Sequence, residues 1–143
     1  MTRLLLINPN TSDSVSALIR AEAERSASPG TEIEVLTAPF GAAYIETRFE
    51  PLIGAYAAAT LAAEHCDAHD AIVVAAFGDP GIDGLRELLD IPVVGMTPRT
   101  IPTFTTSWNR IIEARPAANS VPKASLDRHP SARIRHIRRT NSR

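Results

Sequence analysis

Apolar runs of strand length alternate with helix-forming segments along the first part of the chain. Four runs favour strands, at residues 3–8, 32–37, 70–76 and 91–96. Three segments between them favour helices: one from Thr11 or Ser12 to a stop at 28–30, one over 51–66, and one over about 81–89. This alternation predicts an α/β fold with a parallel four-stranded sheet, flanking helices and right-handed crossovers. The run at 70–76 is nearly all apolar, which predicts a central strand.

Each predicted helix has small or apolar side chains to set against the sheet. In the first helix they are Val15, Leu18 and Ile19. In the third they are Ile82, Leu85, Leu88 and Leu89. The second helix can open at Pro51 and is rich in Ala, whose small side chain permits close packing on a sheet.

The charge distribution divides the chain in two. Residues 1–96 carry 5 Lys/Arg and 14 Asp/Glu, a balance of -9, whereas residues 97–143 carry 10 Lys/Arg and 2 Asp/Glu, a balance of +8. All 7 Gly lie before residue 97, and the apolar periodicity stops there too. We therefore expect one α/β domain over residues 1–96 and an irregular or disordered basic tail over residues 97–143.

Composition excludes several classes of protein. The chain of 143 residues is long enough for one domain, and its single Cys excludes an internal disulfide. No apolar stretch approaches the roughly 18 residues of a membrane span, so we expect a cytoplasmic protein with no membrane partner. The sequence also predicts no metal site, because none of its histidines has acidic or Cys partners at ligand spacing. These histidines are His65, His69, His129 and His136.

The chemistry of an open parallel sheet is expected beyond the carboxyl ends of its strands. Three loops lie there: "NPNTS" after the first strand, "APFGAAYIE" after the second and "AAFGDPG" after the third. They supply polar side chains, aromatic walls and backbone amides that suit a small anionic ligand. The candidate binding residues are Asn8, Asn10, Thr11, Tyr44, Phe77 and Gly78. The alternative is that these residues only cap helices, form turns and pack.

The same stretches carry a family resemblance. "LLLINPNTS", "AAYIETRFE" and "VVAAFGDPGIDGLRELLDIPVVGM" resemble the hydantoin and allantoin racemases of the aspartate/glutamate racemase superfamily, over residues 3–96. The resemblance implies one half of a fold in which two similar α/β halves enclose the active site. It also implies cofactor-independent inversion at a carbon next to a carbonyl, with one cysteine from each half removing and returning the proton. Within "FGDPG", it makes Asp79 a turn-forming residue rather than an acid.

The sequence departs from the family pattern at the residues that would do this chemistry. Ala76 stands where the resemblance places the first catalytic Cys, immediately before "FGDPG". The second half, with its own Cys, is expected after residue 96, where the basic tail stands instead. The sole thiol, Cys66, is far in sequence from any strand end, and we expect it to be structural. A racemase-family protein without activity is therefore the favoured hypothesis. Non-catalytic binding of a small carboxylate or imide is the alternative.

The tail has two interpretations. Its lack of Gly and its gain of Arg, Pro and Ser are typical of a GC-rich gene translated in a shifted frame, which is the favoured interpretation and predicts no nucleic-acid partner. The alternative is a genuine basic tail that binds nucleic acid through phosphate contacts. The nucleotide sequence beyond codon 96 distinguishes them. We also expect the isolated half to expose an apolar face, and so to form homo-oligomers or to aggregate.

Overall fold

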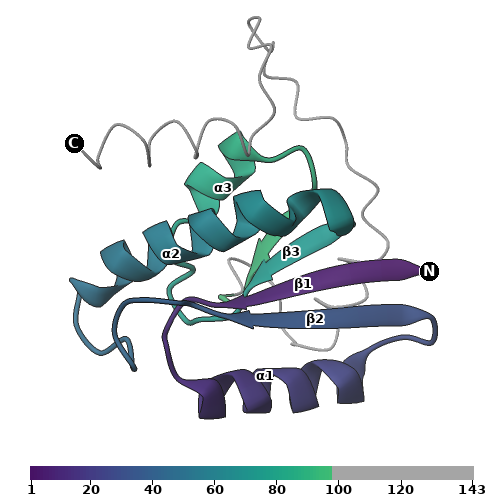
Figure 1. The fold of residues 1–143 in the computed structure, drawn as a ribbon, viewed down its shortest axis with the longest axis horizontal. Coiled ribbons are helices and arrows are strands. Elements are labelled where there is room, and N and C mark those ends of the chain that lie inside the picture. Colours follow the sequence, from purple (N-terminus) through teal and green to yellow (C-terminus); the bar gives the residue numbers. More distant parts are fainter. Residues whose placement is uncertain (98–143) are drawn as a thin grey trace, which may run out of the picture.

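The computed structural model describes residues 1–97 and shows a four-stranded parallel sheet with helices on both faces (Figure 1). The strands are β1 (Thr2–Asn8), β2 (Thr31–Thr37), β3 (Ala71–Val74) and β4 (Val93–Gly95). The helices are α1 (Asp13–Ser26), α2 (Glu50–His65) and α3 (Ile82–Leu88), with a short 3-10 helix η1 (Cys66–Ala68). The predicted α/β class and parallel sheet are thus confirmed. Apart from Thr97, the predicted basic tail at 97–143 lies outside the described residues.

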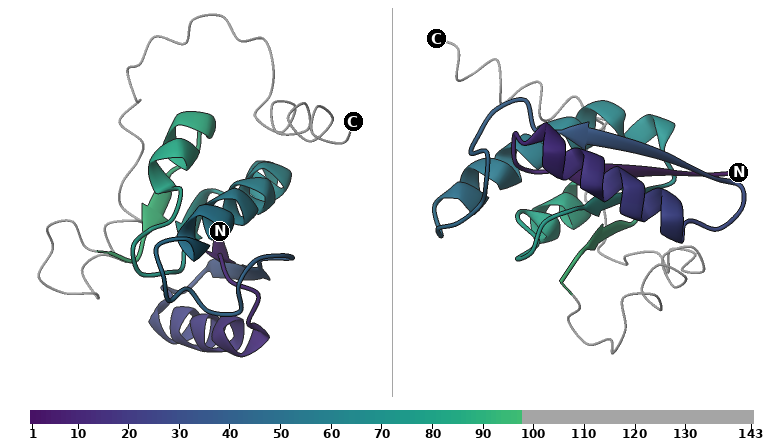
Figure 2. Two further views of the ribbon diagram at one scale, coloured as in Figure 1. Left: turned by 90° about the vertical axis from the view of Figure 1, so that its left-hand side faces the viewer. Right: turned by 90° about the horizontal axis from the view of Figure 1, so that it is seen from below.

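The strand order β2-β1-β3-β4 places β1 and β3 at the centre of the sheet, as the apolar run at 70–76 indicated. Helix α1 covers one face, over β1 and β2, while α2 and α3 cover the other (Figure 2). The chain therefore changes face between β1 and β3. Such a change is the point in an open parallel sheet at which ligands are expected.

The core has two parts because the sheet is buried on both faces. Facing α2 and α3, Leu5, Ile7 and Ile72 pack with side chains of those helices. Facing α1, Leu4 and Leu6 pack with Ala23 and its neighbours. The apolar run of β1 is buried throughout, and each large apolar side chain removed from water contributes about 1.5–3 kcal/mol. This burial fixes the position of the three loops at the carboxyl ends of the strands.

The apolar side of α1 was predicted wrongly in part. Leu18 is 71% exposed, whereas Ser16 and Ala23 are the buried residues of the helix. Ser16 is drawn inward because its hydroxyl has buried polar partners, described below. Helix α3 follows the prediction more closely, with Ile82, Leu85 and Leu89 all buried.

A close approach between α2 and the start of α3 sets the position of the β3–α3 turn. Gly81 has a positive φ of 77°, and a Cβ there would lie 2.9 Å from the Cβ of Ala55. Glycine is therefore required at this position for both conformation and space. No helix in residues 1–97 has the length and apolar character needed to cross a membrane.

Candidate functional site

The loops after β1, β2 and β3 meet at one end of the sheet, as their positions in sequence predicted (Figure 1). Backbone hydrogen bonds tie their starts together: Ala38 N–H donates to the Asn8 carbonyl at 2.9 Å, and Thr11 N–H donates to the Ala42 carbonyl at 3.0 Å. Ala75 N–H, just beyond β3, donates to the Ile7 carbonyl at 2.8 Å. The candidate residues are thus held in one region by the backbone itself.

Asn8 is the centre of a polar network at this end. It is fully buried, and its Nδ2 donates to Asn10 Oδ1 at 2.9 Å, to Ser16 Oγ at 2.9 Å and to the Ser12 carbonyl at 3.1 Å. The Ser16 hydroxyl also bonds to Thr37 Oγ1 at 2.7 Å, which connects α1 to the end of β2. The Asn8 side chain therefore links the end of β1 to the turn before α1 and, through Ser16, to α1 and the end of β2.

Asn10 forms the turn that leads into α1. Its Oδ1 accepts from Ser12 N–H at 3.0 Å, and its own N–H donates to Asn8 Oδ1 at 3.2 Å. A side-chain oxygen that bonds two residues ahead is the pattern of an Asx turn. Within residues 1–97, no acceptor is recorded for the Asn10 Nδ2. Asn10 is 8% exposed, and its amide group is the candidate donor to a ligand.

The sequence alone did not indicate the partners of Asn8. Ser12 and Ser16 are one helical turn apart, and both reach Asn8, from a carbonyl and a hydroxyl respectively. A polar residue at an otherwise inward position of a helix is the signal that could have identified Ser16. Thr11 or Ser12 was expected to cap α1, and Ser12 stands at the N-cap position without a side-chain capping bond.

The turn after β3 carries Ala76, Phe77 and Gly78. Asp79 N–H donates to the Ala76 carbonyl at 3.3 Å, and both Gly78 and Asp79 have positive φ, 87° and 48°. Ala76 is partly buried, whereas Phe77 is 83% exposed. The turn thus presents the Ala76 position at the strand end and directs the Phe77 ring toward solvent.

Two hydrogen bonds connect this turn to the end of β4. Gly78 N–H donates to Thr97 Oγ1 at 3.0 Å, and Thr97 N–H donates to Asp79 Oδ1 at 3.0 Å. The Asp79 carboxylate lies against Gly95, where a Cβ would be 2.1 Å from its Oδ1. Asp79 therefore holds the turn, and the Gly78 N–H is already bonded within the protein. Gly95 and Thr97 are distant in sequence, so no local pattern marked them.

The remaining candidates, Tyr44 and Thr11, lie on the loops that follow β2 and β1. Tyr44 is 57% exposed, and Thr11 is partly buried. Their side chains make no hydrogen bond recorded within residues 1–97. The described structure brings the candidates to one end of the sheet, and their contact with a ligand stays a prediction.

Comparison with known proteins identifies the origin of this arrangement. Residues 4–112 match the Asp/Glu/Hydantoin racemase family. The chain belongs to this family. The match extends past residue 96, and the domain boundary expected there from composition stays a prediction.

This racemase-family chain resembles both hydantoin and allantoin racemases. It is 36% identical over 101 residues to a hydantoin racemase of Paenarthrobacter aurescens, covering 69% of this chain and 43% of that protein. A second hydantoin racemase, of Pseudomonas sp. (strain NS671), is 30% identical over 102 residues, covering 69% of this chain and 40% of that protein.

Two solved structures share the fold. The allantoin racemase from Klebsiella pneumoniae superposes with a TM-score of 0.65 at 37% identity, covering 67% of this chain and 40% of that one. The allantoin racemase of Pseudomonas fluorescens superposes with a TM-score of 0.59 at 39% identity, covering 66% of this chain and 40% of that one. The chain thus spans about two-fifths of the length of its relatives.

The one thiol of this racemase-family chain lies at the opposite end of the sheet from the candidate site. Cys66 follows α2 and precedes β3, whereas Ala76 follows β3. The thiol is buried, and its burial, followed by the nearby Asp67 carboxylate, raises the pKa of Cys66. A thiol kept neutral in this way is a poor base and a poor nucleophile.

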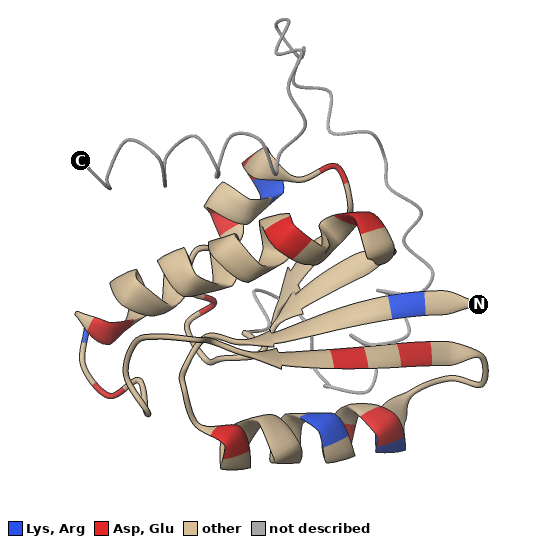
Figure 3. Cartoon of the chain, viewed as in Figure 1, with Lys and Arg blue, Asp and Glu red and all other residues tan. Residues whose placement is uncertain are grey.

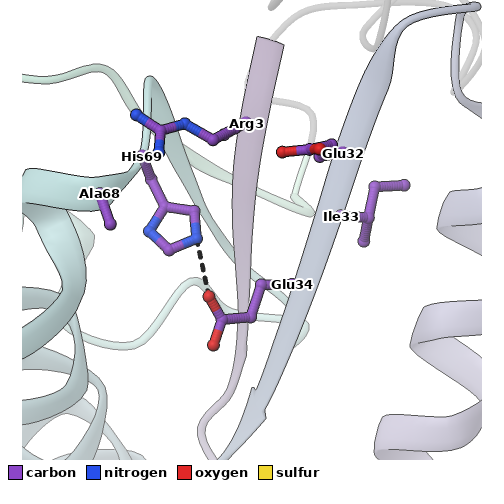
Figure 4. Close-up of a pocket in the computed structure, with 6 residues that line it drawn as sticks. All are labelled: Arg3, Glu32, Ile33, Glu34, Ala68 and His69. Carbon is purple, nitrogen blue, oxygen red and sulfur yellow. Dashed lines mark ion pairs between the residues drawn. The ribbon is translucent and has the colours of Figure 1, made fainter. Parts of the chain in front are cut away.

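The same amino-terminal end of the sheet holds a shallow hollow of about 440 Å³ (Figure 4). On its wall, Nε2 of the buried His69 lies 2.9 Å from Glu34 Oε2, and Nδ1 lies 2.9 Å from the His65 carbonyl. Each ring nitrogen thus lies within hydrogen-bond distance of a protein oxygen, which makes the ring a structural link. No cluster of His, Cys, Asp and Glu within the described residues is arranged to hold a metal ion.

Proposed function

We propose that this chain derives from enzymes that invert a stereocentre next to a carbonyl, and that the 143-residue chain does not itself catalyse the inversion. The relatives are hydantoin and allantoin racemases, so the expected ligands are hydantoins, allantoin or related amino-acid derivatives. The observation that carries the proposal is the separation of Ala76, at the strand end, from the only thiol, at the other end of the sheet.

The chemistry explains why this separation matters. A proton next to a hydantoin carbonyl is weakly acidic, so its removal needs a base held in contact with the substrate. The methyl group of Ala76 cannot accept a proton, and the raised pKa of Cys66 keeps that thiol protonated. Around position 76, the hydrogen bonds of the Asn8 side chain and of the Asp79 carboxylate hold the neighbouring loops in place.

This arrangement of loops supports binding without turnover as the second candidate function. The Asn10 amide and the exposed rings of Tyr44 and Phe77 are the groups that would contact a small carboxylate or imide. Asn8 would act indirectly by holding Asn10, since its own amide hydrogens are directed at protein acceptors. No cofactor is needed for either candidate function.

A racemisation assay tests the catalytic part of the proposal. The purified 143-residue chain is incubated with one enantiomer of a five-substituted hydantoin or of allantoin, and optical rotation is followed, with the Paenarthrobacter aurescens racemase as the positive control. We expect rotation to decay at the uncatalysed rate. Turnover by the chain would show that the inactivity proposal is wrong.

Two further measurements separate loss of the base from loss of the site. The Ala76→Cys variant should also stay inactive, because inversion requires a second base on the opposite face of the substrate. Calorimetry with hydantoin or allantoin then tests binding, with Asn10→Ala as the weakened variant. Heat that saturates with the parent chain and falls with Asn10→Ala would support the binding function.

A further inference from the structure

The two oxygens beside the His69 ring fix where its hydrogens lie. Nδ1 is 2.9 Å from the His65 carbonyl oxygen, and Nε2 is 2.9 Å from Glu34 Oε2. A backbone carbonyl only accepts hydrogen bonds, so the hydrogen of the first contact belongs to Nδ1. A neutral ring with its hydrogen on Nδ1 has a lone pair on Nε2, and that lone pair would face the Glu34 carboxylate.

The contact between Nε2 and Glu34 therefore needs a second proton. Two lone pairs at this distance repel each other, and the His69 side chain is 6% exposed, so little water can separate them. A proton between Nε2 and Oε2 turns the repulsion into a charge-assisted hydrogen bond. Because carboxylates release their protons more readily than imidazoles do, this proton belongs to the ring.

The pair joins two parts of the sheet that have no direct backbone pairing. Glu34 lies on β2, at the edge of the sheet, whereas His69 lies between η1 and β3, and β1 separates the two strands (Figure 4). On the side that α2 covers, β2 adds Leu36 to the core, while Glu32 and Glu34, which alternate onto the same side, are exposed. The contact thus fastens the amino half of β2 to the segment that follows α2.

Several charged groups surround the ring. β2 carries two acidic residues, Glu32 and Glu34, and the neighbouring β1 carries one basic residue, Arg3 (Figure 3). All three line the same hollow as His69. The titratable groups on the adjoining elements are His65 at the end of α2, Asp67 in η1 and Asp70 before β3. Of these groups, Glu34 is the one recorded at hydrogen-bond distance from a ring nitrogen within residues 1–97, so the second proton depends on it.

We propose that His69 and Glu34 form a pH-dependent link, which fastens β2 while the ring holds two protons and releases it when the second proton leaves to solvent. Imidazole is the side chain whose charge ordinarily changes between about pH 5 and 8, which suits a histidine to this role. The proton is bound only while the link is made, so its contribution to stability is present at low pH and is lost as the pH rises. The link is independent of the proposed function, since Ala76 lies at the other end of the sheet.

Nitrogen-15 NMR of the histidine rings in the full 143-residue chain counts the protons. We expect the His69 ring to carry hydrogens on both nitrogens at about pH 5.5 and, once it has released a proton at higher pH, a hydrogen on Nδ1 alone. The His69→Asn variant, which lacks the signal, assigns it. A neutral ring with its hydrogen on Nε2 would contradict the proposal, because Nδ1 would then have no hydrogen for the His65 carbonyl.

Glu34→Gln tests the partner of the ring. A glutamine amide can donate to a neutral Nε2, so this variant keeps a contact that no longer needs the second proton. We expect Glu34→Gln to lower the affinity of His69 for that proton about tenfold. The matched control is Glu32→Gln, which removes the same charge from the same side of the same strand, where no bond to His69 is recorded within residues 1–97. It should lower that affinity less than about twofold.

Urea denaturation of the same chains measures the link itself. Between about pH 5.5 and about pH 8.5, the unfolding equilibrium constant of the parent chain should rise about tenfold relative to that of Glu34→Gln. Relative to Glu32→Gln, it should stay nearly constant. A parent chain that keeps a constant ratio to Glu34→Gln overturns the proposal, and so does a Glu32→Gln variant that behaves like Glu34→Gln. Far-ultraviolet circular dichroism checks that each variant, altered at an exposed residue, retains the fold.

Discussion

The two ends of the sheet differ in what their polar groups do. At the carboxyl end, Asn8 and Asp79 hold loops in place, and the strand end that faces the candidate site carries the inert Ala76. At the amino end lie the groups with reactive side chains, Cys66 and His69, each packed or bonded into the structure. The candidate site therefore carries a methyl group at position 76, while the only thiol lies at the other end of the sheet.

The Asn8 network and the residue at position 76 differ in what they contribute to the fold. Removing the Asn8 network would leave buried polar atoms without partners, so the fold depends on it whether or not the site is active. A residue at position 76 is only partly buried and makes no side-chain hydrogen bond, so the fold accepts a methyl group there. The stability of the fold therefore depends on the Asn8 network and does not depend on which small side chain stands at position 76.

The largest expected difference between the two ends of the sheet is in the rate at which a thiol there is alkylated. In the parent chain, Cys66 is 7% exposed and has a raised pKa, so its alkylation by iodoacetamide requires local opening. In Ala76→Cys, the second thiol is at the partly buried strand end and reacts directly. We expect it to be labelled about a hundredfold faster than Cys66, as followed by mass spectrometry.

Denaturant is the control for this comparison, because both thiols should react at the same rate in the unfolded chain. Equal rates in the folded Ala76→Cys variant would show that the two ends do not differ in accessibility.

Loss of the Asn8 side chain should produce the largest change in stability. Asn8→Ala removes the donor shared by Asn10, Ser12 and Ser16 and leaves a polar cavity at the end of β1. We expect the free energy of unfolding to fall by about 3 kcal/mol, measured by urea denaturation.

Ser14→Ala is the matched control, since the Ser14 hydroxyl is exposed and, within residues 1–97, bonds only to that of Ser12. It should change stability by less than about 0.5 kcal/mol. A similar small loss for Asn8→Ala would mean that the network does not support the fold.

Two glycine-to-alanine substitutions near the β3–α3 turn should change the free energy of unfolding in opposite directions. Gly81→Ala introduces a Cβ 2.9 Å from that of Ala55 at a positive φ, and we expect a loss of about 2 kcal/mol. Gly84→Ala lies in α3 with open space around its new Cβ, and should stabilise by about 0.5–1 kcal/mol. Thermal unfolding of both variants measures the pair. Two changes of the same sign would contradict the close packing of α2 and α3.

Local patterns explain why most of the fold followed from the sequence. The apolar runs of β1 and β3 and the inward spacing of Ile82 and Leu85 each depend on neighbours along the chain, so their periodicity is visible in one dimension. The inward side of α1 did not follow from the local pattern. Ser16 is buried because of partners on β1 and β2, and helical periodicity carries no information about those partners.

The candidate site likewise has features that local sequence predicts and features that it does not. The positions of the three loops followed from the parallel sheet, since carboxyl ends of parallel strands share one edge. The hydrogen bonds that Thr97 makes with the β3–α3 turn join residues distant in sequence, and only the folded structure shows them. That Asn10, Tyr44 and Phe77 contact a ligand stays a prediction.

The smallest expected effect concerns the loop that carries Tyr44. Glu50, at the start of α2, accepts hydrogen bonds from the hydroxyl and the N–H of Thr47, and these bonds lower the pKa of the Glu50 carboxyl. A carboxyl whose pKa is lower in the folded state stabilises the protein above its unfolded pKa. That contribution disappears as the pH falls through the folded pKa. Thr47→Ala should therefore raise the pKa of Glu50 toward its usual value and flatten the acid limb of the stability curve slightly. Carbon-13 NMR titration of the Glu50 carboxyl measures the shift, and an unchanged pKa in Thr47→Ala would show that Thr47 does not anchor this loop to α2.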